Sequence, residues 1–375
     1  MIARFTSLVA GLPATVPFVG PETLERQRSQ PFTARLGANE NGFGPSPKAV
    51  AAMREAAGMV WRYGDPTSHD LREALAEHHG VAVERIAIGE GIDGLLANTV
   101  RLFVEPGTAV VTSEGAYPTF SYHVAGFGGV LHKVPYKDDA EDAEALAEAA
   151  HRHRARLVYF ANPDNPMGLA QSAETVTRLL KALPSDCLLC LDEAYIELAP
   201  EGTAPPWSLD DPRLIRFRTF SKAHGMAGLR LGYAVADPQI VQGFERIRNH
   251  FGVNRMAQTA ALAALGDQAH LQAVCLAVAK SRTRLSAIAA ENGLKALPSA
   301  ANFVAIDCGR DGAFARTVLD ALLGRGVFVR MPGVAPLDRC IRLTCGPEPE
   351  MDVFARALPQ ALAEARAHVA DPAPV

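Results

Sequence analysis

The chain has 375 residues, enough for one large and one smaller domain that each bury a core of their own. Apolar residues make up 48% of the chain and charged residues 21%, the proportions of a soluble globular protein. A formal net charge of −4 argues against nucleic acid or an anionic membrane as a partner.

The N-terminus lacks a secretory signal pattern, because Pro13 and Pro17 interrupt its short apolar runs, and no apolar run has the length of a membrane span. We therefore expect a cytoplasmic protein. Of the six cysteines, Cys187 and Cys190 form a C-x-x-C, but they lie in an apolar run and no second ligand pair follows at zinc spacing. We expect buried, reduced thiols and no metal site.

The first predicted elements lead to a glycine-rich turn. Residues 1–33 lack periodicity and indicate an arm, residues 39–45 are turn-forming, and a helix is predicted over 47–58. A strand over 85–88 then runs into Gly89-Glu-Gly-Ile-Asp-Gly94, formally a G-x-G-x-x-G. Such a turn presents helix N-terminal amides to a phosphate. On this segment alone, an NAD-dependent Rossmann dehydrogenase is one interpretation.

Strands and helices then alternate along the chain. Apolar runs predict further strands over 109–113, 130–134, 157–160, 188–191, 214–219 and 231–236. The charged run over 138–154 predicts a helix with a solvated face and no site. This alternation is typical of an α/β fold with a mainly parallel, seven-stranded sheet between helices. Asp192 ends one of the apolar strands, where its carboxylate needs a cationic partner.

A lysine stands out directly after the strand over 214–219. Lys222 has small neighbours, and Thr219 and Arg230 could converge beside it on one anion. An amine next to an anion site is what an enzyme with lysine-bound pyridoxal phosphate needs. A loop lysine in a glycine-rich turn is the structural alternative for this segment.

The last third of the chain has a different pattern. Helices are predicted over 239–249 and 257–291, the second broken at Gly266 and Asp267. Strands over 301–306, 327–330 and 340–344, with a helix over 311–324, indicate a smaller α+β domain. We therefore predict an arm over 1–45 that packs with the small domain or a dimer partner, a large domain over 46–250 and a small domain over 251–375.

Several motifs in family order resemble the class I/II aminotransferases of fold type I, in their histidinol-phosphate aminotransferase branch. Ser221-Lys222 followed by A-G-L-R-L-G-Y over 227–233 is similar to the lysine segment of that family. Residues 39–45, 61–66, 162–168 and 192–195 resemble its N-E-N-P-x-G, R-Y-P-D-P, N-P-x-N-P-x-G and D-x-x-Y motifs. The departures from the family's usual residues are Gly42, Gly94 and Met167.

The resemblance implies pyridoxal 5'-phosphate as the cofactor and a role for each matching residue. Lys222 would hold the cofactor and move the proton, Asp192 would hold the ring nitrogen, and Tyr195 would bind the phenolic oxygen beside Asn165. Tyr117 would stack on the ring, although Phe120 and Tyr122 are alternatives. The phosphate would be held by Gly91, Ile92, Asp93, Thr219, Ser221, Arg230 and, across a homodimer interface with shared active sites, Tyr63 of the second copy.

The substrates are less closely specified. The resemblance implies ping-pong transamination between a small-molecule amino donor and a 2-oxo acid acceptor, with histidinol phosphate and 2-oxoglutarate as the first expectation. The substrate residues it implies are Arg330, Arg342, Asn41 and Phe18. Phe18 stands where histidinol-phosphate enzymes carry a tyrosine, so an aromatic or other amino acid is an alternative substrate. A lyase similar to threonine-phosphate decarboxylase is a further alternative.

Overall fold

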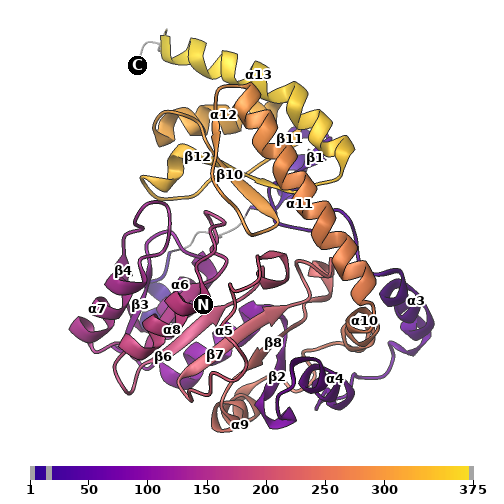
Figure 1. Cartoon of the computed structure of the whole chain (residues 1–375), viewed down its shortest axis with the longest axis vertical. Coiled ribbons are helices and arrows are strands. Elements are labelled where there is room, and N and C mark those ends of the chain that lie inside the picture. The colour runs from indigo at the N-terminus through magenta and orange to yellow at the C-terminus, as the bar shows by residue number, and fades with distance from the viewer. Residues whose placement is uncertain (1–4, 14–18, 371–375) are drawn as a thin grey trace.

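The seven-stranded sheet forms the body of the protein in a computed structural model that describes residues 5–13 and 19–370 (Figure 1). Its strand order is β2-β8-β7-β6-β5-β3-β4. The strands are β2 Ile86–Gly89, β3 Ala109–Ser113, β4 Val130–Val134, β5 Leu157–Ala161, β6 Leu188–Asp192, β7 Leu214–Thr219 and β8 Gly232–Val235. Each lies within one residue of its predicted range, because apolar residues dominate the strands of a sheet that is covered on both faces. The edge strand β4 is partly exposed, and β7 also carries Arg216 and Arg218.

Most neighbouring strands are parallel, as predicted. β4, β3, β5, β6 and β7 run parallel to one another, and only β8 is antiparallel, to both β7 and β2. The glycine-rich string 89–94 follows the edge strand β2, and four other strands separate β2 from the next strand in the chain, β3. A dinucleotide fingerprint belongs to a βαβ unit of adjacent parallel strands. The Rossmann dehydrogenase interpretation of this string is therefore wrong.

Helices cover both faces of this sheet. Alternate residues of β5 divide between two cores: Tyr159 packs with α5, α6 and α9, whereas Val158 and Phe160 pack with α7 and α8. A further core joins α3, α4 and α10 to β2 and β8. These helices are α3 Pro47–Ala56, α4 His69–His79, α5 Gly91–Phe103, α6 Pro118–Gly126, α7 Ala143–His153, α8 Ala173–Ala182, α9 Pro238–Ile247 and α10 Arg255–Leu265.

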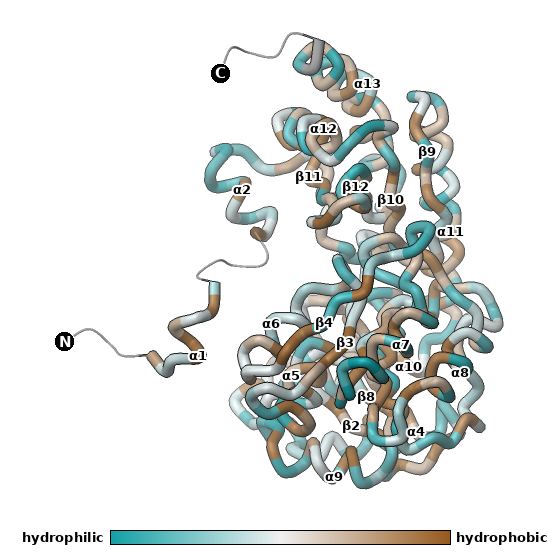
Figure 2. Tube along the Cα trace, turned by 90° about the vertical axis from the view of Figure 1, so that its left-hand side faces the viewer, coloured by the Kyte–Doolittle hydropathy of each residue, from teal (hydrophilic) through white to brown (hydrophobic). Residues whose placement is uncertain are grey.

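A second, smaller body stands beside the first (Figure 1). Its antiparallel sheet has the order β12-β10-β9, with β9 Lys295–Ala296, β10 Phe303–Asp307 and β12 Cys340–Thr344. Its helices are α11 Gln268–Glu291, α12 Gly312–Gly324 and α13 Glu348–Ala370. The short strand β1 Ala34–Arg35 pairs in parallel with β11 Val327–Phe328, so the N-terminal segment joins this smaller body. The remaining helices, α1 Ser7–Ala10 and α2 Pro21–Arg28, lie on the outside of the molecule (Figure 2).

The long helical run over 257–291 is broken where the sequence predicts. α10 ends at Leu265, α11 begins at Gln268, and the two helices meet at 85°. No single helix of the described chain is long and apolar enough to cross a membrane, and only this bent pair meets the length and composition criteria together.

The prediction for the charged run over 138–154 is wrong in its first part. The helix α7 begins only at Ala143, with Asp142 as its N-cap, and Asp138 and Asp139 have φ values of 52° and 65°. Glu141 is 2% exposed, and its carboxylate accepts hydrogen bonds from the Ser113 hydroxyl (2.6 Å) and the Ala161 amide (2.9 Å). A residue predicted on a solvated face is thus a buried polar link between β3 and β5.

Candidate functional site

A cavity of about 740 Å³ lies where the carboxyl ends of the parallel strands face the smaller body. The last residues of β3, β5, β6 and β7 (Ser113, Ala161, Asp192 and Thr219) all line it, as expected of ligand sites in open α/β sheets. The predicted site residues that line it are Ile92, Asp93, Tyr117, Asn165, Asp192, Tyr195, Thr219, Ser221, Lys222, Arg230, Arg330 and Arg342. The fold thus brings together residues that lie up to 250 positions apart.

Lys222 lies in the loop after β7, with its amine inside the cavity. Its Nζ donates to the backbone oxygen of Asn39 at 2.9 Å and lies 5.6 Å from the ring centroid of Tyr195. Burial lowers the pKa of Lys222 to about 8, and the positive charges of Arg342 and Arg230 act in the same direction. A lysine of this kind is partly neutral near physiological pH, so it can act as a nucleophile or a base.

Asp192 is the acidic end of the cavity. Its Oδ2 accepts a hydrogen bond from the Tyr159 hydroxyl at 2.7 Å, and its Oδ1 accepts one from the Ala194 amide at 2.9 Å. Burial raises the pKa of Asp192, although both hydrogen bonds and the charge of Lys222 oppose that rise. Such a buried carboxylate favours a ligand that brings a positive group to it.

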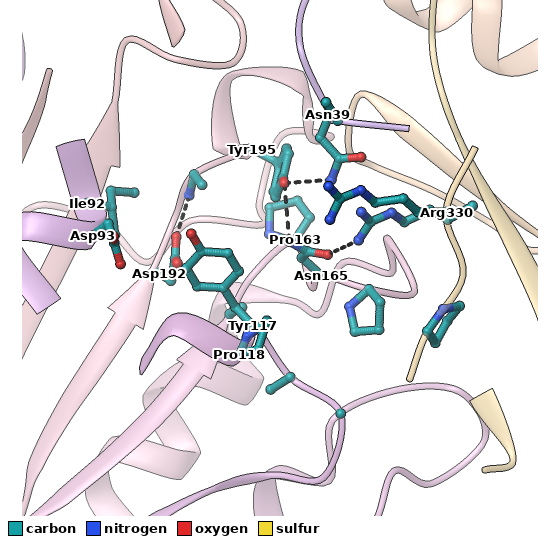
Figure 3. Close-up of a pocket in the computed structure, with 18 of the residues that line it drawn as sticks. Asn39, Ile92, Asp93, Tyr117, Pro118, Pro163, Asn165, Asp192, Tyr195 and Arg330 are labelled. Atoms are coloured by element: carbon teal, nitrogen blue, oxygen red, sulfur yellow. Dashed lines mark hydrogen bonds between the residues drawn. The ribbon is translucent and has the colours of Figure 1, made fainter. Parts of the chain in front are cut away.

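Tyr195 and two asparagines form a hydrogen-bonded group between the cavity's ends (Figure 3). The Tyr195 hydroxyl accepts from Asn39 Nδ2 at 3.1 Å and from Asn165 Nδ2 at 3.5 Å. Asn165 also accepts, through its Oδ1, a hydrogen bond of 2.5 Å from Arg342. Asn165 thereby connects the loop after β5 to the smaller sheet.

The N-terminus of α5 and Arg230 make an anion cradle. Gly91 opens the helix with a φ of 76°, and a Cβ added to it would lie only 2.7 Å from Arg230 Nη2. The amides of Ile92 and Asp93 belong to the first turn of the helix, where backbone N–H groups have no helical partner. A doubly charged phosphate suits this combination of helix terminus and guanidinium.

Thr219 and Ser221 complete that end of the cavity. The Thr219 hydroxyl accepts from the Ser221 amide at 3.0 Å and donates to the Leu231 backbone oxygen at 3.1 Å. The turn that carries Lys222 is therefore tied to the end of β7 and to the start of β8.

Two arginines form the opposite wall. The backbones of Arg330 and Arg342 are joined by an isolated antiparallel bridge. Burial lowers the pKa of Arg342 to about 10, and its Nε is buried without a hydrogen-bond partner. Arg330 Nη2 donates to the Val19 backbone oxygen at 2.8 Å. Strand alternation alone would turn Arg342 toward solvent, but both faces of β12 are covered, so its side chain lies in the cavity.

The structure separates the three aromatic candidates for ring stacking. Phe120 is fully buried in the core beneath the cavity, where it stacks on Tyr159 with centroids 4.7 Å apart. Tyr122 lines the cavity but is 38% exposed. Tyr117 lines it beside Asp192 (Figure 3), and burial raises the pKa of its hydroxyl. Tyr117 is therefore the aromatic side chain best placed over a ring held by Asp192.

Two predicted residues lie outside the lining of the cavity, and a third is not among the described residues. Asn41, expected at the substrate, instead donates from Nδ2 to the backbone oxygens of Lys222 (2.9 Å) and Ala223 (3.1 Å), and this correction makes it a support beneath the lysine loop. Tyr63 is 76% exposed, outside this cavity, and packs on Phe251 at 4.7 Å. Phe18 lies outside the described residues.

Sequence reasoning missed Asn39 and Tyr159. Asn39 contacts both Tyr195 and Lys222, and its φ of 53° is one that asparagine tolerates better than most residues. The sequence signal for Asn39 is the pair of asparagines on either side of Glu40, of which Asn41 is the predicted site residue. The signal for Tyr159 was a hydroxyl in the otherwise apolar strand β5, which must find a buried partner.

The donor set of the cavity fits pyridoxal phosphate. The cradle at Gly91 and Arg230 suits the phosphate, the buried Asp192 suits a protonated ring nitrogen, and the Lys222 amine suits the aldehyde. The hydrogen-bond donors of Asn165 and Tyr195 lie between these groups, where a phenolic oxygen would be.

Comparisons with known proteins agree with this arrangement. The model of the family "Aminotransferase class I and II" matches residues 33–358. A histidinol-phosphate aminotransferase of Moorella thermoacetica is 36% identical over 353 residues, which cover 93% of this chain and 90% of the relative. One from an Anaeromyxobacter species is 38% identical over 345 residues, or 90% of this chain and 93% of the relative.

A solved structure is also similar over nearly the whole chain. It is the histidinol-phosphate aminotransferase of Sinorhizobium meliloti in complex with pyridoxal-5'-phosphate, with 55% identity, a TM-score of 0.94, and coverage of 97% of this chain and 98% of that one. These comparisons confirm three predictions: the family that the motifs resemble, fold type I, and pyridoxal phosphate as the cofactor. The chain belongs to the class I and II aminotransferases, enzymes that depend on pyridoxal phosphate.

Proposed function

We propose that this aminotransferase exchanges the amino group of histidinol phosphate with 2-oxoglutarate. The observation that carries the proposal is the wall formed by Arg330 and Arg342, opposite the cofactor cradle, where the buried Arg342 Nε has no partner. Two guanidiniums suit a substrate phosphate, and they also suit the carboxylates of the acceptor. The names of the similar enzymes support the same substrate class.

The chemistry assigns separate tasks to the residues of this chain. Pyridoxal phosphate, when bound, supplies the electron sink for a carbanion. Lys222 Nζ would take the proton from the substrate carbon that carries the amine and would hold it for its return. Asp192 would hold the ring nitrogen of the cofactor, and Tyr195 with Asn165 would orient its phenolic oxygen. The cofactor phosphate would be held by Gly91, Ile92, Asp93, Thr219, Ser221 and Arg230, and Tyr117 would cover the ring.

The substrate proposal is tested with single amino donors. Visible absorbance of the bound cofactor is followed as histidinol phosphate, phenylalanine, glutamate and phosphothreonine are added separately to purified enzyme. Faster conversion by histidinol phosphate than by phenylalanine supports the proposal. Conversion by phenylalanine alone moves the enzyme to the aromatic aminotransferases, and release of carbon dioxide from phosphothreonine identifies a lyase.

The arginines are tested by comparing histidinol phosphate with histidinol. Arg342→Gln and Arg330→Gln should each raise KM for histidinol phosphate by about 10- to 100-fold. This factor corresponds to the free energy lost with one hydrogen bond to a charged group. KM for histidinol, which has no phosphate, should change little. Equal losses for both substrates would show that the arginines do not meet the phosphate.

We also propose a homodimer with shared active sites, in which Tyr63 reaches the cofactor phosphate of the second copy. Its support is the exposed apolar group of Val60, Trp61, Tyr63 and Phe251 on the larger body, since a monomer rarely exposes several large apolar side chains together. Mixing inactive Lys222→Ala with weakly active Tyr63→Ala should restore activity in mixed dimers. Unchanged activity after subunit exchange would contradict shared sites.

The domains that the sequence predicts are an arm over 1–45, a large domain over 46–250 and a small domain over 251–375, and the separate sheets of the two bodies support two domains. Because α10 Arg255–Leu265 packs in the core of the larger body, we propose that the boundary between the two domains lies after Leu265. We further propose a cytoplasmic location, which the six free cysteines support, since secreted proteins usually oxidise such thiols. Fractionation of the producing cells tests the location, and recovery of the protein outside the cytoplasm would contradict it.

A further inference from the structure

Tyr159 is a buried tyrosine whose hydroxyl serves a single carboxylate. It lies in the middle of β5, next to β6, where it pairs with Cys190 two residues before Asp192. Its side chain is 0% exposed, and its hydroxyl lies 2.7 Å from Asp192 Oδ2. The ring stacks on Phe120 at an angle of 19°, which fixes the direction of the hydroxyl.

Packing alone does not require this hydroxyl. The other residues of β5 are Leu157, Val158, Phe160 and Ala161, all apolar and buried, and phenylalanine would fill the same volume as Tyr159. A buried hydroxyl is unfavourable unless it is hydrogen-bonded, so the contact with Asp192 accounts for the tyrosine. Burial first, and then the charge of Asp192, raises the pKa of Tyr159 well above its usual value, so the phenol stays a donor.

The direction of this hydrogen bond matters for Asp192. Burial disfavours the ionised carboxylate, and the donors that oppose burial are the Tyr159 hydroxyl and the Ala194 amide. An ionised Asp192 carboxylate pairs with a protonated ring nitrogen through a charge-assisted hydrogen bond, whereas a neutral carboxyl group supplies no such charge. The hydrogen bond from the Ala194 amide comes from the backbone, so Tyr159 is the side chain whose hydrogen bond opposes the rise in the pKa of Asp192.

We propose that Tyr159 is a positioning residue that keeps Asp192 ionised and oriented, and thereby sets how strongly the cofactor's ring nitrogen holds its proton. This inference rests on the role of Asp192 proposed above. Tyr159 touches no reacting atom, and its effect on the reaction passes through Asp192.

The test compares Tyr159→Phe with Tyr233→Phe. Tyr233 is another buried tyrosine of the same sheet, but its hydroxyl is hydrogen-bonded to His79 Nε2 at 2.8 Å, away from the cavity. Both variants remove one buried hydroxyl and are first compared by thermal unfolding. The main measurement is the 15N resonance of ring-labelled cofactor bound to each protein, followed from pH 5 to 9.

In Tyr159→Phe the ring nitrogen should shift toward its unprotonated position, and the acid limb of kcat/KM should rise by about one pH unit, because a lost hydrogen bond to a charge moves a pKa by that amount. Tyr233→Phe should leave both unchanged. Identical nitrogen titrations in all three proteins would overturn the inference.

A second variant covers the case in which Tyr159→Phe does not fold. Replacing Tyr159 by 3-fluorotyrosine makes the hydroxyl a stronger donor and should shift the nitrogen titration the opposite way, whereas no shift would overturn the inference. The nitrogen resonance does not depend on the amino donor. A wild-type protein that binds labelled cofactor but rejects histidinol phosphate would therefore count against the proposed substrate and leave this test intact.

Discussion

Lys222 illustrates how a single side chain is prepared for its chemistry at the expense of stability. Burial and the charges of two arginines disfavour the protonated amine, so the pKa of Lys222, about 8, lies below the usual value for lysine. Below the folded pKa the protein must bury a charged amine, which disfavours the folded state. As the pH rises from about 8 to about 10.4, the unfolded chain binds more protons than the folded one, so this penalty is relieved.

The prediction for Lys222 follows from that sign. In cofactor-free protein, the free energy of unfolding of the wild type should rise relative to that of Lys222→Met between about pH 8 and about pH 10.4. Urea unfolding at a series of pH values measures the difference. A difference that is flat over this interval would mean that Lys222 titrates normally. The same variant should also lose all transaminase activity.

Gly91 allows a second prediction at the scale of one residue. An alanine there would adopt a φ of 76° and place its Cβ 2.7 Å from Arg230 Nη2. Gly80 has a similar φ of 64° but nothing within 4 Å of a Cβ, so Gly80→Ala is the matched control. Both should lose about 1–2 kcal/mol of stability through left-handed backbone strain.

Only Gly91→Ala should also weaken cofactor binding, because it displaces Arg230 from the phosphate cradle. Equilibrium titration of cofactor-free protein with pyridoxal phosphate gives both dissociation constants. Equal affinities for the two variants would show that Arg230 is not part of the cradle.

At the scale of elements, Glu193 links the end of β6 to β7 immediately behind the site. It is 1% exposed and pairs with Arg216 (2.7 Å) and Arg218 (3.0 Å). Burial alone would raise the pKa of Glu193, but Arg218 and Arg216 lower the pKa overall. The stability that the ionised Glu193 contributes is therefore lost as the pH falls from the usual carboxyl pKa through the lowered one. The guanidinium of Arg216 also lies 3.8 Å from the ring centroid of Trp207.

Glu193→Gln should therefore cost about 3–5 kcal/mol, because it leaves the buried Arg216 without its anion and Arg218 with only the longer contact to Glu197 (3.7 Å). Glu174→Gln is the control, since Glu174 is paired with Arg178 at 4.0 Å on an exposed helix face. That substitution should change stability by less than about 0.5 kcal/mol. Chemical unfolding of both proteins measures the contrast, and similar losses would contradict it.

At the scale of the whole molecule, Arg339 connects the two bodies near the cavity. Its guanidinium contacts Asp139 of the larger body and Asp307 of the smaller sheet, both at 2.8 Å. An apolar cluster beside it contains Met167 from the larger body and Leu337 from the smaller one. Because Arg342 and Asn165 meet across the same junction, the relative position of the bodies shapes the substrate wall.

Arg339→Gln should raise KM for the amino donor about three- to tenfold while costing only about 1 kcal/mol of stability, since these ion pairs are partly exposed. The control is Arg325→Gln, because Arg325 pairs with Glu364 inside the smaller body at 2.7 Å. Steady-state kinetics and thermal unfolding are measured for both. A KM increase in the control as large as that in Arg339→Gln would refute a specific role for the junction.

The sequence by itself determined the seven-stranded sheet, its mainly parallel character and the motifs whose polar residues line the cavity. These depend on local features: apolar runs long enough for buried strands, and polar motifs at the ends of those strands, which a parallel sheet gathers at one edge. The breaks in the helical run over 257–291 are local as well, because Gly266 and Asp267 end one helix and begin the next.

Only the tertiary structure decided between side chains of equal local promise. Asn39, and not Asn41, faces the cavity, where it is hydrogen-bonded to Tyr195. Because Tyr195 lies 156 positions later in the chain, the local sequence does not reveal this contact. Glu141, predicted on a solvated helix face, is instead buried and hydrogen-bonded to Ser113 and Ala161. The Arg342 side chain lies in the cavity because both faces of its strand are covered. The Tyr159 hydroxyl is explained by its hydrogen bond to Asp192, which lies 33 positions later in the chain. Each outcome depends on a partner that only the folded chain brings within hydrogen-bonding distance.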